Sequence, residues 1–165
     1  MDGSLELVSA SHEQQSILAN LLELYAHDFS EFHQIPLGDD GRFRYPDLPL
    51  YWSEPDWHPI LVKIDDKWAG FALVRKGSRV STDQNVWDMA EFFVLREDRR
   101  LGLGTRIAHE VWRKFPGAWQ VRVMQANLSA YRFWQKATDA FTGNAVHSSR
   151  FEMNGETVNL FAFNS

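Results

Sequence analysis

Cysteine is absent from this 165-residue chain, which excludes disulfide bonds, thiolate metal sites and an acyl-cysteine intermediate. A basic excess is also absent, because 17 Lys and Arg face 22 Asp and Glu for a net charge of −5, so we expect no nucleic-acid partner. No uninterrupted apolar run approaches the roughly 18 residues of a membrane helix, and the first residues lack a signal-peptide pattern. We therefore expect a cytoplasmic protein that does not bind membranes.

Aromatic residues, in contrast, are plentiful: 12 Phe, 7 Trp and 4 Tyr in a chain that is 44% hydrophobic. The length and this composition predict one domain, spanning residues 1–165, with a continuous core. Five of the six prolines lie between positions 36 and 59, interleaved with aromatic residues. This segment is too aromatic for a linker. We expect an ordered, mostly irregular stretch, with a short helix near residues 48–52, that covers the core or lines a pocket.

Hydrophobic periodicity predicts strands and helices that alternate along the chain. Ser11 and Gln14 form a capping-box pattern for a first helix that continues to Phe32. Asn154-Gly155 is a strong signal for a closing hairpin. The other predicted strands lie at 5–7, 60–64, 68–74, 86–95 and 119–123, and the other helices at 107–115 and 130–141. This order predicts an α/β or α+β fold with one mixed sheet covered by helices.

A glycine-rich turn separates the predicted strand 86–95 from the helix that follows it. Gly102 and Gly104 would allow the backbone to approach a ligand closely, and the amides and dipole of a helix N-terminus attract phosphate. The turn lacks the lysine of a P-loop, and Ile107 stands where a Rossmann motif needs its third glycine. These residues alone are compatible either with an anion site or with a tight turn that only serves packing.

Two motifs at matching separation resemble those of the GNAT superfamily of N-acetyltransferases. Arg99-x-x-Gly102-x-Gly104 resembles the family's signature for acyl-coenzyme A, and Asn127-x-x-Ala130-x-x-Phe133-Trp134 resembles its later motif. The order of the predicted elements also resembles that of the family over nearly the whole chain. The resemblance implies a mixed central sheet of about six to seven strands with helices on both faces.

Acetyl-coenzyme A is the cosubstrate that this resemblance implies. The amides between Leu101 and Thr105 would bind its pyrophosphate, and a bulged strand that splays from its neighbour would pair with the pantetheine. The implied coenzyme-binding residues are Phe93, Val94, Arg99, Arg100, Leu101, Gly102, Leu103, Gly104, Thr105, Asn127, Ala130, Phe133 and Trp134.

Direct attack of an amine on a thioester requires a base, because alkylammonium groups with a pKa of about 10.4 are protonated at neutral pH. Glu91 is our first candidate, since it interrupts an apolar strand on which the family often keeps its base; a structural pairing with an arginine or a backbone amide is the alternative. Asp88 is the reserve. The family's usual acid is a Tyr where this chain has Trp134, so Tyr131 is the remaining candidate.

The acceptor that the resemblance implies is a primary amine of a small molecule or a peptide. The first helix, the proline-rich segment and the last hairpin shape the acceptor site in this family, and the hairpin's outer edge leaves a homodimer open. No metal site is expected, because Arg113 stands where a zinc-protease helix starting at His109 needs its second His. The candidate acceptor residues are Tyr25, Phe29, Tyr45, Tyr51, Trp52 and Trp57.

Two competing functions remain at this stage. Trp134 in place of a tyrosine is compatible with a non-catalytic module that binds or senses acyl-coenzyme A. An interaction domain that uses its aromatic segment would bind no coenzyme at all.

Overall fold

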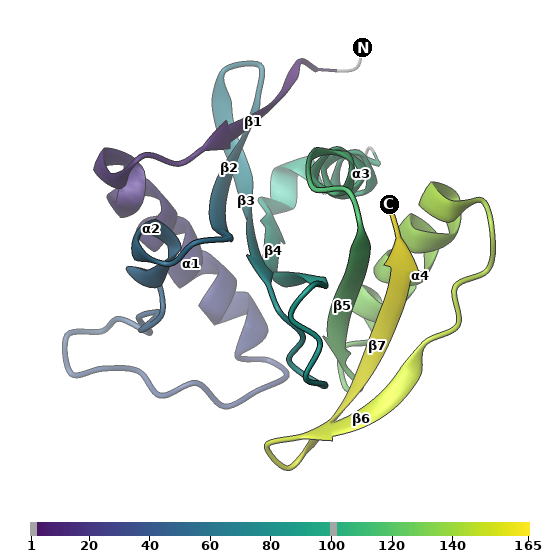
Figure 1. Ribbon diagram of the computed structural model, residues 1–165. Coiled ribbons are helices and arrows are strands. Elements are labelled where there is room, and N and C mark those ends of the chain that lie inside the picture. Colours follow the sequence, from purple (N-terminus) through teal and green to yellow (C-terminus); the bar gives the residue numbers. More distant parts are fainter. Residues whose placement is uncertain (1–2, 100–101) are drawn as a thin grey trace.

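Seven strands form one sheet in the computed structural model, which describes residues 3–99 and 102–165 (Figure 1). The strand order is β1-β2-β3-β4-β5-β7-β6, and every neighbouring pair is antiparallel except β4 and β5, which are parallel. The strands are β1 (Leu5–Ser9), β2 (Trp57–Ile64), β3 (Lys67–Lys76), β4 (Trp87–Val94), β5 (Ala118–Met124), β6 (Ser149–Met153) and β7 (Glu156–Asn164).

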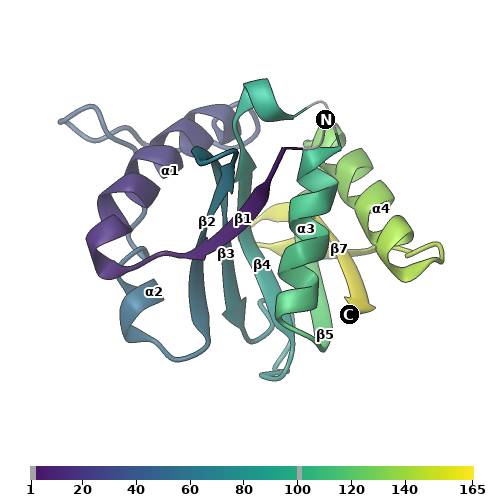
Figure 2. The ribbon, with the colours of Figure 1, turned by 90° about the horizontal axis from the view of Figure 1, so that it is seen from above.

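Helices cover both faces of this sheet. Figure 2 shows α1 and α2 on one side and α3 and α4 on the other. The α-helices are α1 (Gln15–Phe29), α2 (Leu50–Ser53), α3 (Leu103–Lys114) and α4 (Leu128–Thr142), and two short 3₁₀ turns are η1 (His12–Gln14) and η2 (Arg96–Asp98). None of the helices in the described ranges is long and apolar enough to cross a membrane.

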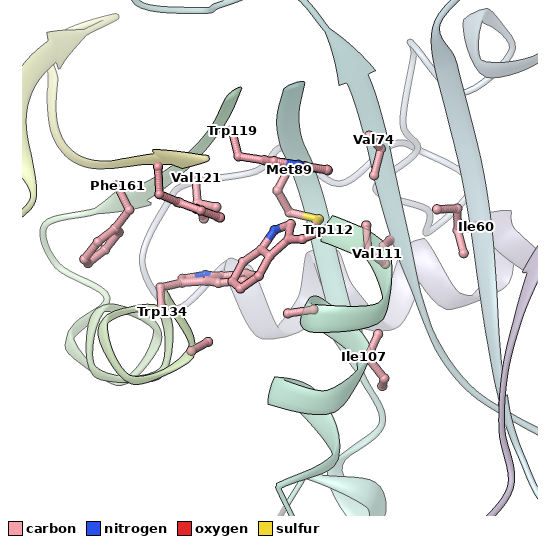
Figure 3. Close-up of a cluster of buried hydrophobic side chains, with 14 of the residues drawn as sticks. Ile60, Val74, Met89, Ile107, Val111, Trp112, Trp119, Val121, Trp134 and Phe161 are labelled. Carbon is pink, nitrogen blue, oxygen red and sulfur yellow. The ribbon is translucent and has the colours of Figure 1, made fainter. Parts of the chain in front are cut away.

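Two hydrophobic clusters, one on each face, hold the layers together. Figure 3 shows the larger cluster, in which side chains from β2, β3, β4, β5 and β7 meet those of α3 and α4. Trp112 of α3 lies at its centre, with its ring centroid 4.7 Å from that of Phe163 and 6.1 Å from that of Trp134. A buried aromatic side chain removes roughly 150–250 Å² from water, worth about 4–6 kcal/mol before entropy is counted.

The smaller cluster fixes α1 against the other face of the sheet. Leu18, Leu21 and Leu22 of α1 pack on Leu61, Phe71 and Leu73 of the central strands. The helix spacing of these leucines puts them on one stripe, as amphipathic periodicity requires. The packing holds α1 against β2 and β3, and residues near its C-terminus line the site described below.

The predicted sheet, helices and closing hairpin are confirmed, and the differences lie at element ends. The hairpin turn uses Asn154 and Gly155, both with positive φ. The capping box forms, since Ser11 N donates to Gln14 Oε1 at 3.0 Å, but it opens the 3₁₀ turn before α1. The first helix ends at Phe29 and not at Phe32, because the following residues form turns and the chain then bends toward Pro36.

Candidate active site

The site lies where β4 and β5 diverge. Parallel pairing between them is confined to Trp87 with Trp119 and Asp88 with Gln120, although β4 continues to Val94. On its other side β4 pairs with β3 through a bulge, since Leu73 faces Glu91 while Val74 faces Met89. The divergence creates a cleft of about 800 Å³ lined by α1, β4, β5 and the first turns of α3 and α4. The bulged, splayed strand that the resemblance implies is therefore present.

The N-terminus of α3 forms one end of this cleft. Gly102 adopts a left-handed conformation, with φ of 70°, that turns the chain into the helix. The amides of Leu103, Gly104 and Thr105 are in the first helical turn and have no partner within the helix, so they can donate to an anion. Of the predicted coenzyme residues, Arg100 and Leu101 lie outside the described residues.

Close packing of α3 on α4 explains the second glycine of the turn. A Cβ atom at Gly104 would lie 3.0 Å from the Phe133 ring, so any side chain there would push the two helices apart or fill the cleft. Phe133 and Trp134 in turn pack on Phe92, with ring centroids 5.8 and 5.0 Å from it. Gly104 and these three aromatic residues all line the cleft.

Asn127 caps α4. Its Oδ1 accepts a hydrogen bond from Ala130 N at 3.0 Å, which satisfies one of the free amides of the helix N-terminus. Both residues line the cleft beside Phe93 and Val94. The first residue of the motif thus has a structural role in this chain as the cap of α4.

Asp28 of α1 binds two arginines that follow β4. Its two carboxylate oxygens accept from Arg96 Nη2 and Arg99 Nη2, each at 2.6 Å. Arg99 Nε also donates to Val94 O at 2.7 Å. Although partial burial opposes it, hydrogen bonding by Arg99 and Arg96 holds the pKa of Asp28 below its ordinary value. We call these three residues the Asp28 clasp; it ties the loop before α3 to α1.

Glu91 occupies the middle of the cleft with two phenols directed at its carboxylate. Tyr25 of α1 donates to Oε2, and Tyr45 donates to Oε1 at 3.1 Å. The Tyr25 ring is itself fixed by Phe29, Phe71 and Phe93, whose centroids lie 5.7, 5.8 and 6.1 Å away. Two separate parts of the chain, α1 and the proline-rich segment, therefore hold this carboxylate of β4 in place.

Glu23 orients the loop that carries Tyr45. Its Oε2 and Oε1 accept from Phe43 N at 2.8 Å and Arg44 N at 3.0 Å, where Arg44 has a positive φ of 62°. Sequence reasoning missed Glu23 because it lies on the exposed side of an amphipathic helix, as most helical glutamates do. The proline-rich segment is thus ordered partly from α1.

Burial raises the pKa of Glu91 above its ordinary value. Hydrogen bonds from Tyr25 and Tyr45, followed by the charges of Arg122 and Arg75, partly offset this effect. Burial and the neighbouring Glu91 raise the pKa of both phenols, so they stay protonated and act as donors. A carboxylate with a raised pKa in a cleft has the properties of a general base.

The structure gives the two other catalytic candidates different surroundings. Asp88 is 0% exposed and accepts hydrogen bonds from Arg75 and Arg122, so it is the acidic partner in a buried ion-pair network. It is not among the residues that line the cleft. Tyr131 binds Ser148 Oγ through its hydroxyl at 2.9 Å and also lies outside the cleft lining. Neither side chain is positioned to exchange a proton there.

The acceptor candidates divide into two groups. Tyr25, Phe29 and Tyr45 line the cleft as expected. Tyr51, Trp52 and Trp57 do not, which corrects the sequence interpretation: Tyr51 is 2% exposed, Trp52 Nε1 donates to Ala10 O at 2.9 Å, and all three pack in the smaller cluster. The contacts of these three side chains anchor α2 on the sheet. The cleft also contains residues that the sequence did not indicate, namely Phe32, Arg75, Met124 and Arg122.

A family model described as "Acetyltransferase (GNAT) family" matches residues 18–138, which contain both motifs and every residue around Glu91 described above. The chain belongs to the GNAT family of acetyltransferases.

Solved GNAT structures share its fold. An acetyltransferase from Thermus thermophilus has 15% identity and a TM-score of 0.71, with 100% of both chains covered. Aminoglycoside acetyltransferase AAC(6')-Ib, in complex with coenzyme A and kanamycin, has 15% identity and a TM-score of 0.71, with 98% of this chain and 95% of the other covered. Arabidopsis thaliana NAA60, in complex with a bisubstrate analogue, has 12% identity and a TM-score of 0.64, with 98% of each covered. No curated protein matches the sequence significantly.

Proposed function

We propose that this GNAT protein is an acetyl-coenzyme A-dependent N-acetyltransferase that acetylates a primary amine by direct attack in a ternary complex. The observation that carries the proposal is the Glu91 carboxylate, which two tyrosines hold in the cleft between the splayed edge of β4 and the N-terminus of α3. A base, an anion-binding helix end and a free strand edge thus border one cavity.

The residues of the cleft fit the coenzyme. Free amides of the α3 N-terminus suit a pyrophosphate, and the part of β4 beyond Asp88, which lacks pairing with β5, suits an extended pantetheine. The absence of a side chain at Gly104 keeps this path open. Coenzyme A in the AAC(6')-Ib structure supports the same use of the shared fold.

Glu91 would accept the proton that an ammonium acceptor must lose before it attacks. Bound acetyl-coenzyme A would supply the thioester carbon to which the amine nitrogen bonds and the thiol that leaves when the carbon–sulfur bond breaks. A backbone amide of β4 would donate to the thioester oxygen. The indole N–H of Trp134 can donate a hydrogen bond but cannot deliver a proton at neutral pH. The sulfur, whose thiol has a reference pKa of about 8.5, would therefore leave as a thiolate, and the second proton that the attacking nitrogen loses would pass to water or, through water, to this thiolate.

Calorimetry and a thiol-release assay test this proposal together. The parent protein should bind acetyl-coenzyme A and release thiol in the presence of an amine from a panel of amino acids, polyamines, aminoglycosides and peptide N-termini. Gly104→Trp, which fills the path beside Phe133, should abolish binding. Failure of the folded parent protein to bind acetyl-coenzyme A would contradict the proposal.

A non-catalytic sensor of acyl-coenzyme A is the second candidate. Trp134 favours it, because this buried indole replaces the family's usual acid and instead packs on Trp112 and Phe92. Tight coenzyme binding without turnover on any amine of the panel would favour the sensor, whereas turnover that Glu91→Gln removes would favour the enzyme.

A further inference from the structure

Two arginines on the floor of the cleft share a single carboxylate. Asp88, on β4, accepts from Arg75 Nε of β3 at 3.1 Å and from Arg122 Nε and Nη2 of β5 at 3.1 and 3.0 Å. The two arginine side chains are 11% and 19% exposed, and both line the cleft. Asp88 can neutralise only one of the two positive charges.

Both guanidinium groups have N–H donors beyond those that bind Asp88. In the described part of the chain, every hydrogen bond that they donate ends on Asp88, which leaves Nη1 and Nη2 of Arg75 and Nη1 of Arg122 without an acceptor. These terminal nitrogens keep some solvent access, since neither arginine has a fully buried unpaired nitrogen. The Trp57 ring, 5.2 Å from Arg75 Cζ, holds that group in orientation. Two fixed guanidinium edges facing a cavity suit a planar oxyanion.

A third arginine shows that positive charge accumulates here. Burial, together with the charges of Arg75 and Arg122, lowers the pKa of Arg79, while Asp88 only partly opposes this. Although burial opposes it, Asp88 and then the charge of Glu91 raise the pKa of Arg122 above its ordinary value. When Glu91 takes a proton, or faces the ammonium group of an acceptor, the arginines are left with an uncompensated charge.

The acidic residues near the cleft do not reverse this balance. Asp28 is engaged by Arg96 and Arg99, and Asp40 pairs with Arg44. Glu31, which also lines the cleft, is exposed just beyond the end of α1. A polycationic acceptor would therefore meet the two arginines in the same cleft as Glu91.

We propose that the acceptor is an amine that also carries a carboxylate, with the amine at Glu91 and the carboxylate on the open edges of Arg75 and Arg122. The inference rests on the N-acetyltransferase activity proposed above. Tyr25, Phe29 and Phe32 add an aromatic wall to the same cleft. An amino acid with an apolar or aromatic side chain combines the three required groups: amine, carboxylate and apolar substituent.

Matched acceptors test the carboxylate directly. L-Phenylalanine, phenylalaninamide and phenethylamine share a primary amine and a phenyl ring but differ in the carboxylate, and leucine with its amide and its decarboxylated amine provides a second set. Rates are compared per concentration of neutral amine. The parent enzyme should favour the amino acid by about 10- to 100-fold in kcat/KM, as expected for hydrogen bonds between charged groups.

Arg75→Gln and Arg122→Gln identify the residues responsible. Each variant leaves Asp88 one arginine partner, so the network keeps a neutralised carboxylate. Each should lower the preference for the amino acid over its carboxylate-free amine about tenfold or more, because the loss of positive charge near Glu91 affects both acceptors alike while the loss of the carboxylate contact affects only the amino acid. Arg113→Gln, which removes an exposed arginine paired with Glu110, should leave the preference unchanged. A merely structural role would affect all acceptors equally.

The outcomes separate this inference from the function on which it rests. Equal or better use of the amides and amines, or an unchanged preference in both variants, would overturn the carboxylate site while leaving the acetyltransferase intact. If a glutamine variant fails to fold, Arg122→Lys replaces it, because lysine keeps a positive charge beside Asp88 but lacks the planar guanidinium group. This variant should also lower the preference for the amino acid, and an unchanged preference would contradict the carboxylate site. Absence of turnover on every amine would contradict the proposed activity itself.

Discussion

At the scale of the residue, the proposed chemistry depends on one glutamate and the groups that hold it. Sequence reasoning found Glu91 because a carboxylate interrupts an apolar strand, which is visible in the letters. It could not find that Tyr25 and Tyr45 donate to that carboxylate, since these tyrosines lie 66 and 46 positions away from it and nothing in their spacing links them. Asp88, the reserve candidate on the same strand, lies at the centre of an arginine pair, which its place in the sequence did not indicate.

Glu91→Gln is expected to lower kcat by about 100- to 10,000-fold, the usual contribution of a general base. The amide keeps the shape of the carboxylate and still accepts a hydrogen bond from one tyrosine, so acetyl-coenzyme A should bind with little change. Steady-state kinetics and calorimetry on the same preparation measure both quantities. Near-parental turnover in this variant would exclude Glu91 as the base.

Tyr25→Phe should move the acidic limb of the kcat/KM profile to higher pH. The hydrogen bond from Tyr25 lowers the pKa of Glu91, so its removal raises that pKa further. Activity requires the deprotonated carboxylate and rises with pH through this pKa; the shift should be about one pH unit. Tyr131→Phe is the matched control, because its hydroxyl binds Ser148 outside the cleft. If the acidic limb of the profile moved in Tyr131→Phe and stayed in place in Tyr25→Phe, the assignment of that limb to Glu91 would be contradicted.

At the scale of the element, the position of β4 decides where the cleft opens. Gly70 of β3 lets β4 approach closely, since a Cβ there would lie 2.1 Å from Phe93 O. Periodicity predicted both strands, but the divergence of β4 from β5 depends on long-range pairing, which a pattern of apolar residues does not encode. The end of α1 was misjudged for a similar reason, as Phe32 keeps helical spacing although it lines the cleft from a turn.

Gly70→Ala should destabilise the fold by roughly 1–3 kcal/mol, in the range of overpacked core positions. The methyl group must displace the backbone at Phe93, so coenzyme affinity should fall with stability. Urea denaturation and calorimetry provide the two measurements. Gly41→Ala is a useful contrast, because its site is open to solvent and no atom lies within 4 Å of the added methyl, leaving only the strain of its positive φ.

Asp28→Asn tests the clasp between α1 and the loop before α3. Because the pKa of Asp28 is lowered in the folded state, its charge stabilises the fold above the ordinary aspartate pKa, and this contribution disappears as pH falls through the folded-state pKa. The parent protein should exceed the variant by about 1 kcal/mol in free energy of unfolding at pH 7, since the arginines are partly exposed.

The difference should vanish when the same denaturation is repeated near pH 2 to 3, and high salt should reduce it at pH 7. A difference that stayed constant down to acid pH would show that the clasp contributes through packing and not through charge.

At the scale of the whole molecule, a seven-stranded sheet joins two clusters, and the cleft passes between α1 on one face and α4 on the other. The order of strands and helices along the sequence predicted this architecture, because the alternation of periods is a property of the entire chain. Two motifs predicted one end of the cleft. The proposed acceptor end contains Tyr45, Arg75 and Arg122, whose hydrogen-bond partners lie near them only in the folded chain.

Acetyl-coenzyme A should stabilise the whole domain, since the proposed site is built from α3, α4 and β4 and exists only when they are assembled. At 100 times its Kd it should add about 2.7 kcal/mol, or a rise in Tm of roughly 5–10 °C. A thermal melt with and without the coenzyme measures the shift. Gly104→Trp should show none, and an equal shift in that variant would place the coenzyme elsewhere.

We propose that the cleft around Glu91 transfers an acetyl group to an amine, and thiol release from acetyl-coenzyme A, measured with the amine panel on the parent protein and on Glu91→Gln, tests this most directly. We expect amine-dependent release by the parent protein and its loss in the variant, with coenzyme binding retained in both. Coenzyme binding without release on any amine, or equal release by the two proteins, would contradict it.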